Sequence, residues 1–580
     1  MSYGARLVAA VLLPVISSTP AVAQTTERVS VDSAGVQAND SSEYASISAD
    51  GNFVVFVSNA TNLVAGDANG VPDVFVHDRQ GGTTERVSVS STGTEGDAGS
   101  GYYGQFAISA DNRFVAFTSY ASNLVAGDTN GVSDVFVRDR ALGTTERVSI
   151  STSGAEGNLA SQGASISADG RFVGFSSDAS NLVVGDTNGA LDGFVRDRAN
   201  SMTERVSVSS AGAEGNNGSG VTSISADGRF VAIETSATNF DPTDTDWCTD
   251  VYVRDRRNGT TERVSIPTFG VQVNVPCSPA TSMISADGRF VAFDNCSATL
   301  VAGDTNGCLD VFVRDRIANT TERVSVSTAG VQANDNAYIT AISADGRFVA
   351  FISVASNLVA GDTNAAADVF VRDRSTSTTE RVSLANGSAQ GNSHSGWPSI
   401  SADGRVLAFS SHASNLVAGD TNATTDIFVR DLAPQVYYCS AGTTSSGCSA
   451  SIAATTPPSA SFAHACSIAV ANVEGLKSGV LFYGIDNTGW TPGPWGTGSS
   501  SYLCVKQPTQ RTPIQNSGGT FGACDGSFVL DWNAYQSTHP LALGNPWSMG
   551  AKVYVQAWFR DPPAAKTSNL SNALELTYVP

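Results

Sequence analysis

Oxygen-bearing side chains recur at a fixed spacing in seven loops of this sequence, in the pattern Asp-x-(Asn or Asp)-x-x-x-Asp. Oxygens at this spacing can surround one hard cation, because Ca²⁺ accepts several oxygen ligands in a flexible geometry. The same residues could instead form a turn in which the Asp side chains cap backbone N–H groups. The candidate ligands are Asp67, Asn69 and Asp73; Asp128, Asn130 and Asp134; Asp186, Asn188 and Asp192; Asp244, Asp246 and Asp250; Asp304, Asn306 and Asp310; Asp362, Asn364 and Asp368; and Asp420, Asn422 and Asp426.

A comparison of the seven loops with one another bears on this choice. Gly follows the Asn in four loops, but Trp247, Ala365 and Ala423 replace it in the others, while the three oxygen-bearing positions persist in all seven. If these residues formed only a turn, Gly would be expected after the Asn or Asp in all seven loops. A structural Ca²⁺ that pins the loops and a cation-free turn therefore both stay open, and no other cofactor is expected.

Motifs for catalysis give no comparable signal. The sequence contains no Gly-x-Ser-x-Gly, no His-Glu-x-x-His and no Gly-rich phosphate loop that opens a helix. His394 and His412 fall in one repeat and could lie on one face, which is the one hint of an asymmetric site. Asp and Arg residues that recur in every repeat are better explained as turn caps and cross-strand pairs. No catalytic residue is expected.

The elements that carry the acidic loops belong to a repeat of 58 to 61 residues marked by Ser-Ala-Asp. Four strand signals follow one another in each repeat, and an Asp-Gly or Asp-Asn turn joins the first two, as between 164–167 and 171–175. Four antiparallel strands, repeated seven times, are typical of propeller blades. The Asp residues of the seven turns are Asp50, Asp111, Asp169, Asp227, Asp287, Asp345 and Asp403.

A count of the fourth strand predicts how the repeats close. Its Thr-Glu-Arg-Val-Ser signature begins before the first repeat, at Thr26, and none follows the seventh repeat. A closed ring lets residues 26–31 complete the last blade beside Phe428, and this removes both exposed edges. We therefore predict an all-β fold, with a seven-bladed β-propeller over residues 24–434 closed by the N-terminal strand. An open stack or two smaller propellers are the alternatives.

The pattern in residues 1–23 predicts a signal peptide. Arg6 is followed by an apolar run over 7–16 and by Ala21-Val22-Ala23, a small-x-small cleavage pattern. No later stretch approaches ~18 uninterrupted apolar residues, so no membrane span is expected, and the protein should be periplasmic or extracellular. The net charge of −21, with only four lysines, argues against nucleic acid as a partner.

The repeats resemble a known family. Ser-Ala-Asp-Gly-Arg-Phe-Val-Ala-Phe followed by Asp-Val-Phe-Val-Arg-Asp-Arg is similar to the WD-like repeats of TolB-type propellers over residues 25–432. That family includes translocation partners, peptidase accessory domains and uncharacterised exported proteins, so the resemblance implies a fold and not a function. The α/β domain that precedes the propeller in TolB has no counterpart here. The acidic loops also resemble part of the calcium loops of integrin-type propellers.

Nine cysteines fit an exported protein, in which disulfides persist. In a propeller the loop after the second strand and the segment before the next blade share a face, so we expect Cys248 to pair with Cys277. Cys296 and Cys308 flank one loop and are expected to pair with each other. In the C-terminal region we expect Cys439 with Cys448 and Cys504 with Cys524, which leaves Cys466 unpaired.

Residues 435–580 lose the repeat and contain five of the seven tryptophans. Six strand-like runs between 466 and 579 predict an antiparallel β-sandwich as a separate domain. Tyr438-Cys439, Cys504-Val505-Lys506, 556–562 and Leu576-Thr577-Tyr578-Val579 resemble a C-terminal module of unknown function found on secreted bacterial proteins. Trp490 and Trp495 could stack on a sugar, although packing is the commoner role of such residues.

Residues that differ from blade to blade are the candidates for binding. Aromatic and histidine residues precede or begin the first strands near the expected channel mouth: Tyr44, Tyr102, Tyr103, Tyr338, His394 and Trp397. Ordinary loop filling is the alternative role. The favoured function is a non-enzymatic, monomeric scaffold that binds a protein or a glycan. The second candidate is a calcium-assisted hydrolase or lyase acting at the central channel.

Overall fold

The computed structural model describes residues 25–432 apart from 105, 246 and 269–280, and separate segments between 436 and 577. The chain divides into two compact units, one of which is Gln24–Leu432, while Ala433–Pro580 belong to the other. Each unit is described by itself below. Within the described residues, no helix is long and apolar enough to cross a membrane.

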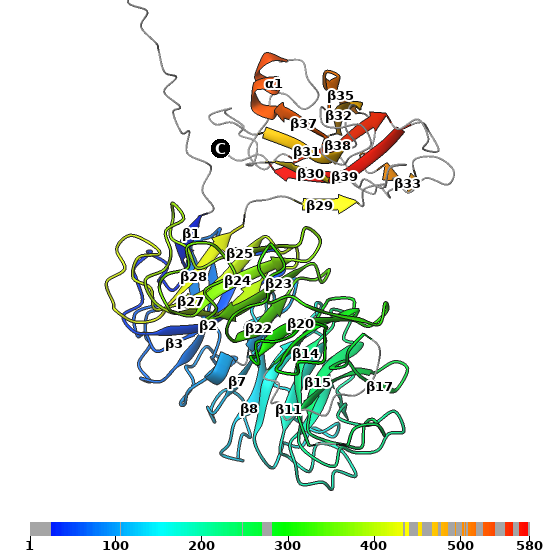
Figure 1. Ribbon diagram of the computed structural model, residues 1–580. Coiled ribbons are helices and arrows are strands. Elements are labelled where there is room, and N and C mark those ends of the chain that lie inside the picture. Colours follow the sequence, from blue (N-terminus) through cyan, green and yellow to red (C-terminus); the bar gives the residue numbers. More distant parts are fainter. Residues whose placement is uncertain are drawn as a thin grey trace, which may run out of the picture. The chain divides into compact units, whose positions relative to one another are not determined.

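Seven four-stranded antiparallel sheets make up the first unit, as the sequence predicts (Figure 1). Their strands are, in blade one, β2 (Ser42–Ile47), β3 (Phe53–Ser58), β4 (Asp73–Asp78) and β5 (Thr83–Arg86); in blade two, β6 (Phe106–Ile108), β7 (Phe114–Ser119), β8 (Asp134–Asp139) and β9 (Thr144–Arg147); in blade three, β10 (Ser161–Ile166), β11 (Phe172–Ser177), β12 (Asp192–Asp197) and β13 (Met202–Arg205); in blade four, β14 (Ser219–Ile224), β15 (Phe230–Thr235), β16 (Asp250–Asp255) and β17 (Thr260–Arg263); in blade five, β18 (Ser282–Ile284), β19 (Phe290–Asn295), β20 (Asp310–Asp315) and β21 (Thr320–Arg323); in blade six, β22 (Ala337–Ile342), β23 (Phe348–Ser353), β24 (Asp368–Asp373) and β25 (Thr378–Arg381); and in blade seven, β26 (Ser395–Ile400), β27 (Val406–Ser411), β28 (Asp426–Asp431) and β1 (Thr26–Arg28).

The N-terminal strand closes the ring. Strand β1 pairs antiparallel with β28, with Thr26 opposite Arg430 and Arg28 opposite Phe428. The first strands of the blades contact one another in succession, and the last of them, β26, contacts the first, β2. The predicted closure is confirmed, and these seven first strands, here called the inner strands, surround the centre of the ring.

Hydrophobic side chains of the second and third strands form cores between neighbouring blades. Both faces of these strands are buried, as in β3, where every residue after Phe53 is buried. Phe56 and Phe75 lie opposite each other across β3 and β4 with ring centroids 5.9 Å apart, and most other blades repeat this pair. The alternating apolar strands of the sequence thus build seven similar interfaces.

The Ser-Ala-Asp turns join the blades through backbone hydrogen bonds. In blade three the Asp169 carboxylate accepts from the Ser167 hydroxyl and from the Arg171 N–H, which fixes the turn. The Ala N–H of one turn then donates to the Ala C=O of the next blade's turn, as Ala168 does to Ala226 at 2.9 Å. Six such bonds are formed, and the last, from Ala402 to Ala49 at 3.0 Å, joins blade seven to blade one.

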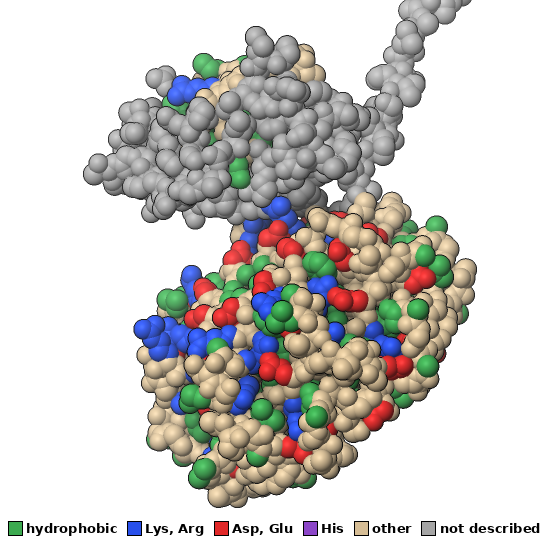
Figure 2. Space-filling view, turned by 180° about the vertical axis from the view of Figure 1, so that it is seen from behind, with side chains coloured by type: hydrophobic (Ala, Val, Ile, Leu, Met, Phe, Trp, Pro, Cys, Tyr) green, Lys and Arg blue, Asp and Glu red, His purple; other side chains and the backbone are tan. Residues whose placement is uncertain are grey.

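Arginine side chains form a second connection between neighbouring blades. The Arg140 guanidinium of blade two lies over the Phe53 ring of blade one, 4.6 Å from its centroid, and its Nε donates to Glu85 at 2.6 Å. Equivalent arginines act at later junctions, and Leu432 stands in this place in blade seven. Figure 2 shows blue basic and red acidic side chains side by side on one face of the propeller.

In the second unit, the described residues form three sheets and one helix, α1 (Trp532–Thr538). Trp532, Tyr483 and Phe528 belong to its buried core. Strand β37 ends at Asp531 and is followed directly by this helix, which the sequence did not predict; Trp490 and Trp495 lie outside the described residues. The strands are β29 (Val436–Cys439), β30 (Ser451–Ala454), β31 (Ser467–Val473), β32 (Ser478–Gly484), β33 (Gly493–Pro494), β34 (Tyr502–Leu503), β35 (Gln510–Arg511), β36 (Gln515–Asn516), β37 (Gly526–Asp531), β38 (Lys552–Arg560) and β39 (Ser568–Thr577).

Candidate functional site

An arginine enters the acidic loop of every blade. In blade one, Nη1 of Arg86, at the end of β5, lies 3.1 Å from Asp73 and 3.3 Å from Asp67. Its positive charge thus lies beside the two carboxylates that the sequence suggested as ligands of a cation. The other arginines, each with its two loop carboxylates, are Arg147 (Asp128, Asp134), Arg205 (Asp186, Asp192), Arg263 (Asp244, Asp250), Arg323 (Asp304, Asp310), Arg381 (Asp362, Asp368) and Arg28 (Asp420, Asp426).

The loop asparagines support the turn. The side-chain oxygen of Asn69 accepts from the Val71 N–H at 3.1 Å, and its nitrogen donates to Asp73 at 2.9 Å. This differs from the expected ligand role. The amide oxygen already accepts a hydrogen bond within the turn, and the amide nitrogen donates to the carboxylate. Asn130, Asn188, Asn306, Asn364 and Asn422 make the same bonds, while Asp246 lies outside the described residues.

Three blades add a third carboxylate that sequence reasoning did not single out. Glu95 accepts from the backbone N–H groups of Ala68 and Asn69 and lies 3.2 Å from Arg86. The resulting groups could hold a metal ion, since their oxygen atoms lie within 4.8 Å of one another: Asp67, Asp73 and Glu95; Asp128, Asp134 and Glu156; Asp186, Asp192 and Glu214. Gln332, Gln390 and Gln37 take the place of the Glu in blades five, six and seven.

The charge balance of these triads differs from that of the Gln-containing loops. Three carboxylates share one arginine, so two negative charges remain uncompensated when all three ionise. Burial is the main cause that raises the pKa of Asp67 to about 6 and that of Asp128 to about 6. Burial acts in the same sense on Glu156, but hydrogen bonds from Thr129 and the charge of Arg147 prevail and lower its pKa to about 2. The donor chemistry therefore fits a hard cation, which would have to displace the arginine.

Two aromatic side chains meet where blade seven joins blade one. The rings of Tyr44 in β2 and Trp397 in β26 lie with centroids 5.1 Å apart and planes tilted by 55°. Both residues sit in β-bulges and have left-handed backbone conformations, with φ of 51° and 50°. Blade three has Gly163 at the bulge of its inner strand, with φ of 77°. A bulky residue in this conformation is unusual, because the left-handed region is strained for side chains of this size.

The pair lies near the face that carries the acidic loops. The backbone N–H of Ser42, at the start of β2, donates to Thr425, which directly precedes β28 at the end of the last acidic loop. Equivalent bonds join the acidic loops of blades one, two, three, five and six to the segment at the start of the next inner strand, as from Ser161 to Ser133. The beginning of each inner strand and the acidic loops therefore share one end of the channel, which we call the channel mouth.

The other binding candidates have different surroundings. Tyr338 in β22 is exposed, while Tyr102 packs edge-on against Tyr120. His394 accepts a backbone hydrogen bond from Ala367 and so helps to hold the acidic loop of blade six. The backbone N–H of His412 donates to the His394 carbonyl at 2.9 Å, so the two residues are neighbours, and the His412 ring contacts the Thr425 hydroxyl. Nothing is described of the Tyr103 side chain.

Two neighbouring carboxyl groups, one buried and one partly buried, distinguish blades four and five. Asp294 in β19 is fully buried, and Oε1 of Glu234 in β15 has no hydrogen-bond donor among the described residues. Burial and the nearby Asp294 charge raise the pKa of Glu234 to about 8. Val57 and Ile352 hold the corresponding place in blades one and six, so a comparison of repeats could have found this pair.

Two cysteine expectations are wrong. Cys296 is disulfide-bonded, whereas Cys308 is a free thiol, so these two do not pair. Cys248 forms no disulfide either, so its expected bond to Cys277 is not made. Flanking one loop in the sequence did not suffice, because Cys308 follows Asn306 in the acidic turn and its thiol is held near the Asn306 carbonyl, at 3.6 Å. Cys277, Cys448, Cys466, Cys504 and Cys524 lie outside the described residues, and the side chain of Cys439 is not described.

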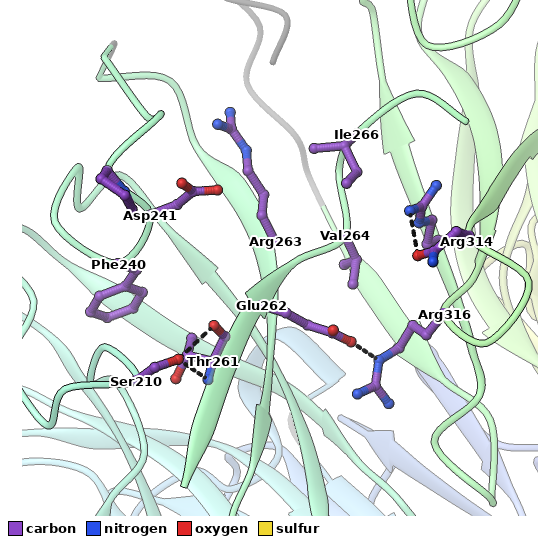
Figure 3. Close-up of a pocket in the computed structure, with 12 residues that line it drawn as sticks. Ser210, Phe240, Asp241, Thr261, Glu262, Arg263, Val264, Ile266, Arg314 and Arg316 are labelled. Carbon is purple, nitrogen blue, oxygen red and sulfur yellow. Dashed lines mark hydrogen bonds and ion pairs between the residues drawn. The ribbon is translucent and has the colours of Figure 1, made fainter. Parts of the chain in front are cut away.

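A hollow of about 480 Å³ lies beside β17 of blade four. In Figure 3, Glu262 points toward Arg316, and Ser210 lies against Thr261. Phe240 and Pro242 contribute apolar lining. The polar groups Glu262, Arg316, Ser210 and Thr261 are thus paired within the wall, and we assign the hollow no ligand.

Comparisons with known proteins found similar structures but no matching sequence family. No protein-family model matches this sequence, and no curated protein matches it. The structure resembles that of a TolB from Agrobacterium tumefaciens at 16% identity, covering 49% of this chain and 80% of that one with a TM-score of 0.31. It also resembles the propeller domain of the Trilobed protease from Pyrococcus furiosus, which has an open velcro topology, at 10% identity, covering 68% and 95% with a TM-score of 0.41. An acylaminoacyl peptidase from Pyrococcus horikoshii matches at 10% identity, covering 75% and 59% with a TM-score of 0.38. The resemblance to TolB-type propellers is thus one of structure, without a shared sequence family.

Proposed function

We propose that this protein is an exported, non-enzymatic, monomeric β-propeller that binds a protein or glycan partner at its channel mouth. The observation that carries the proposal is the contact between Tyr44 and Trp397. Left-handed backbone costs a bulky residue ~1–2 kcal/mol, so a ring kept there at two adjacent blades needs a compensating role. Binding supplies that role, since Trp397 keeps 52% of its surface exposed.

Binding fits the described polar residues better than catalysis does. The arginines and carboxylates that recur in the blades are engaged with one another in ion pairs. His394 and His412, the hint of an enzyme in the sequence, bind local groups of the acidic loops. The pattern in residues 1–23 supports export.

Calcium belongs to this proposal only in blades one, two and three. Their triads hold one carboxylate more than the loops of blades five, six and seven. A divalent cation at these positions would balance the excess charge and pin the loops, while the remaining loops rely on arginine alone. Its role would be structural.

The test is a search for the partner with a matched pair of variants. Full-length protein and its Trp397→Ala variant are used to capture ligands from envelope and culture-supernatant fractions and on a glycan array. We expect a specific ligand that the variant fails to retain. Ile317→Ala serves as the control, because Ile317 is also exposed, at 75%, but lies in the turn between β20 and β21, at the end of β20 away from its acidic loop. Equal capture by the Trp397 variant would contradict binding at the channel mouth.

A further inference from the structure

Only four side chains of the described inner strands are exposed: Glu43 in β2, Gln162 in β10, Tyr338 in β22 and Trp397 in β26. Two of these four residues are aromatic, one is a carboxylate and one is an amide. Three of them occupy the second position of their strands and Trp397 the third, so they lie at one level of the channel mouth.

The aromatic pair is built as a rigid platform. Tyr44 packs on the hydrophobic core between blades one and two, and a Cβ on Gly104 would come within 2.7 Å of its ring. Trp397 rests on this anchored ring, and the Pro398 that follows it is buried. A flat ring that is held in place loses little conformational freedom when a ligand stacks on it.

The chemistry around the platform narrows the class of ligand. No exposed aliphatic side chain lies on the described inner strands, whereas the centre of a protein-binding surface is usually a contiguous apolar cluster. Residues 25–432 contain no lysine. Arginines of the neighbouring acidic loops are engaged by carboxylates, as Arg28 is by Asp420 and Asp426, so a polyanion would find little compensating charge.

Resting on the function proposed above, we infer that the channel mouth binds a neutral carbohydrate. One C–H face of a pyranose ring stacks on Trp397, and its hydroxyl groups hydrogen-bond to Glu43 and Gln162. A carboxylate accepts and an amide both donates and accepts, which suits an array of hydroxyls. Tyr338 offers a second ring for a neighbouring sugar unit. The class of ligand is thus a neutral hexose or N-acetylhexosamine oligosaccharide.

The test is titration calorimetry on the full-length protein with neutral hexose and N-acetylhexosamine oligosaccharides as probes, and with sulfated and uronic acid oligosaccharides for comparison. We expect at least one neutral probe to bind and the anionic probes not to bind. Trp397→Gly is the main variant, because glycine suits the left-handed backbone and the variant should fold. It should weaken binding at least tenfold, and Ile317→Ala, in the exposed turn between β20 and β21, should leave it unchanged.

Three outcomes would overturn the inference. They are no binding of any neutral probe, equal binding by Trp397→Gly, or preferential binding of the anionic probes. If no sugar binds but a protein is captured by the wild type and lost by Trp397→Gly, the carbohydrate inference fails while the proposed function stands. If neither a sugar nor a protein depends on Trp397, both fail.

Discussion

The hydroxyl of Ser30 donates a hydrogen bond to Oδ1 of Asp426 at 2.6 Å, although 396 residues separate them in the sequence. Blade one makes the same bond locally, from Ser88 to Asp73 at 2.5 Å. The acidic loop of blade seven is therefore completed by the N-terminal segment, which also supplies Arg28 to it. The same N-terminal segment therefore closes the ring and completes the last acidic loop.

This relationship predicts the effect of Ser30→Ala. Both members of the bond are buried, so the free energy of unfolding should fall by about 1–3 kcal/mol because Asp426 loses a donor. Ser88→Ala in blade one is the matched control and should cost about as much. Urea denaturation measures both. A loss for Ser88→Ala without one for Ser30→Ala would show that the N-terminal segment does not complete the loop.

The glutamates of the triads predict a response to calcium. Added Ca²⁺ should raise the melting temperature of the wild type by a few degrees, and a chelator should reverse the gain, because a ligand that binds only the folded state stabilises it. Replacing Glu95, Glu156 and Glu214 together by Gln reproduces the donor set of blades five to seven and should abolish the response. Identical wild-type melts with Ca²⁺ and with chelator would rule out the cation.

The partly buried Glu234 predicts a pH dependence of opposite sign to that of an ordinary salt-bridged acid. Its pKa is raised to about 8, so the folded protein holds a proton that the unfolded chain has released. The stability it contributes is fully present below its unfolded value near 4.5 and is lost as the pH rises through 8.

Melting temperature measured from pH 5 to 9 tests this prediction. In the wild type, the free energy of unfolding should fall by about 1.4 kcal/mol for each pH unit between the unfolded and folded pKa values of Glu234, and Glu234→Gln should remove this fall. Glu43→Gln, at an exposed carboxylate of β2, is the control and should not change the slope. An unchanged slope in Glu234→Gln would mean that Glu234 is ionised in the folded protein at neutral pH.

The backbone at Trp397 predicts an inverted order of stability for two variants. Glycine usually destabilises a strand relative to alanine, but at φ of 50° the Trp397→Gly variant should be more stable than Trp397→Ala by about 1 kcal/mol. Gly163→Ala at the bulge of blade three should lower the free energy of unfolding by a similar amount. Its added Cβ meets only ordinary contacts at 3.6 Å, so the loss would come from the left-handed backbone and not from a clash. Thermal melts compare the three. A Trp397→Ala variant as stable as Trp397→Gly would remove the argument from strain.

Sequence patterns predicted the propeller well because they record a local and repeated requirement. Strands with two buried faces and Asp-Gly turns identify each blade, and the copy of the fourth strand at Thr26 has nowhere to pair except beside Phe428. The interior of the acidic loop was not predicted. Arg86 was interpreted as a cross-strand residue, although the constant sequence separation between this Arg and the last Asp of the acidic loop in blades one to six was a usable signal.

By itself, the sequence determined the number of blades and the way the ring closes, because unpaired strand edges are costly and the count of strands leaves one solution. Only the tertiary structure decided which side chains meet within that frame. Arg86 enters its loop, Cys308 remains apart from Cys296, and Trp397 lies on Tyr44 because packing and backbone geometry bring distant residues together. Such contacts depend on side-chain direction in three dimensions, which the spacing of residues along a chain does not specify.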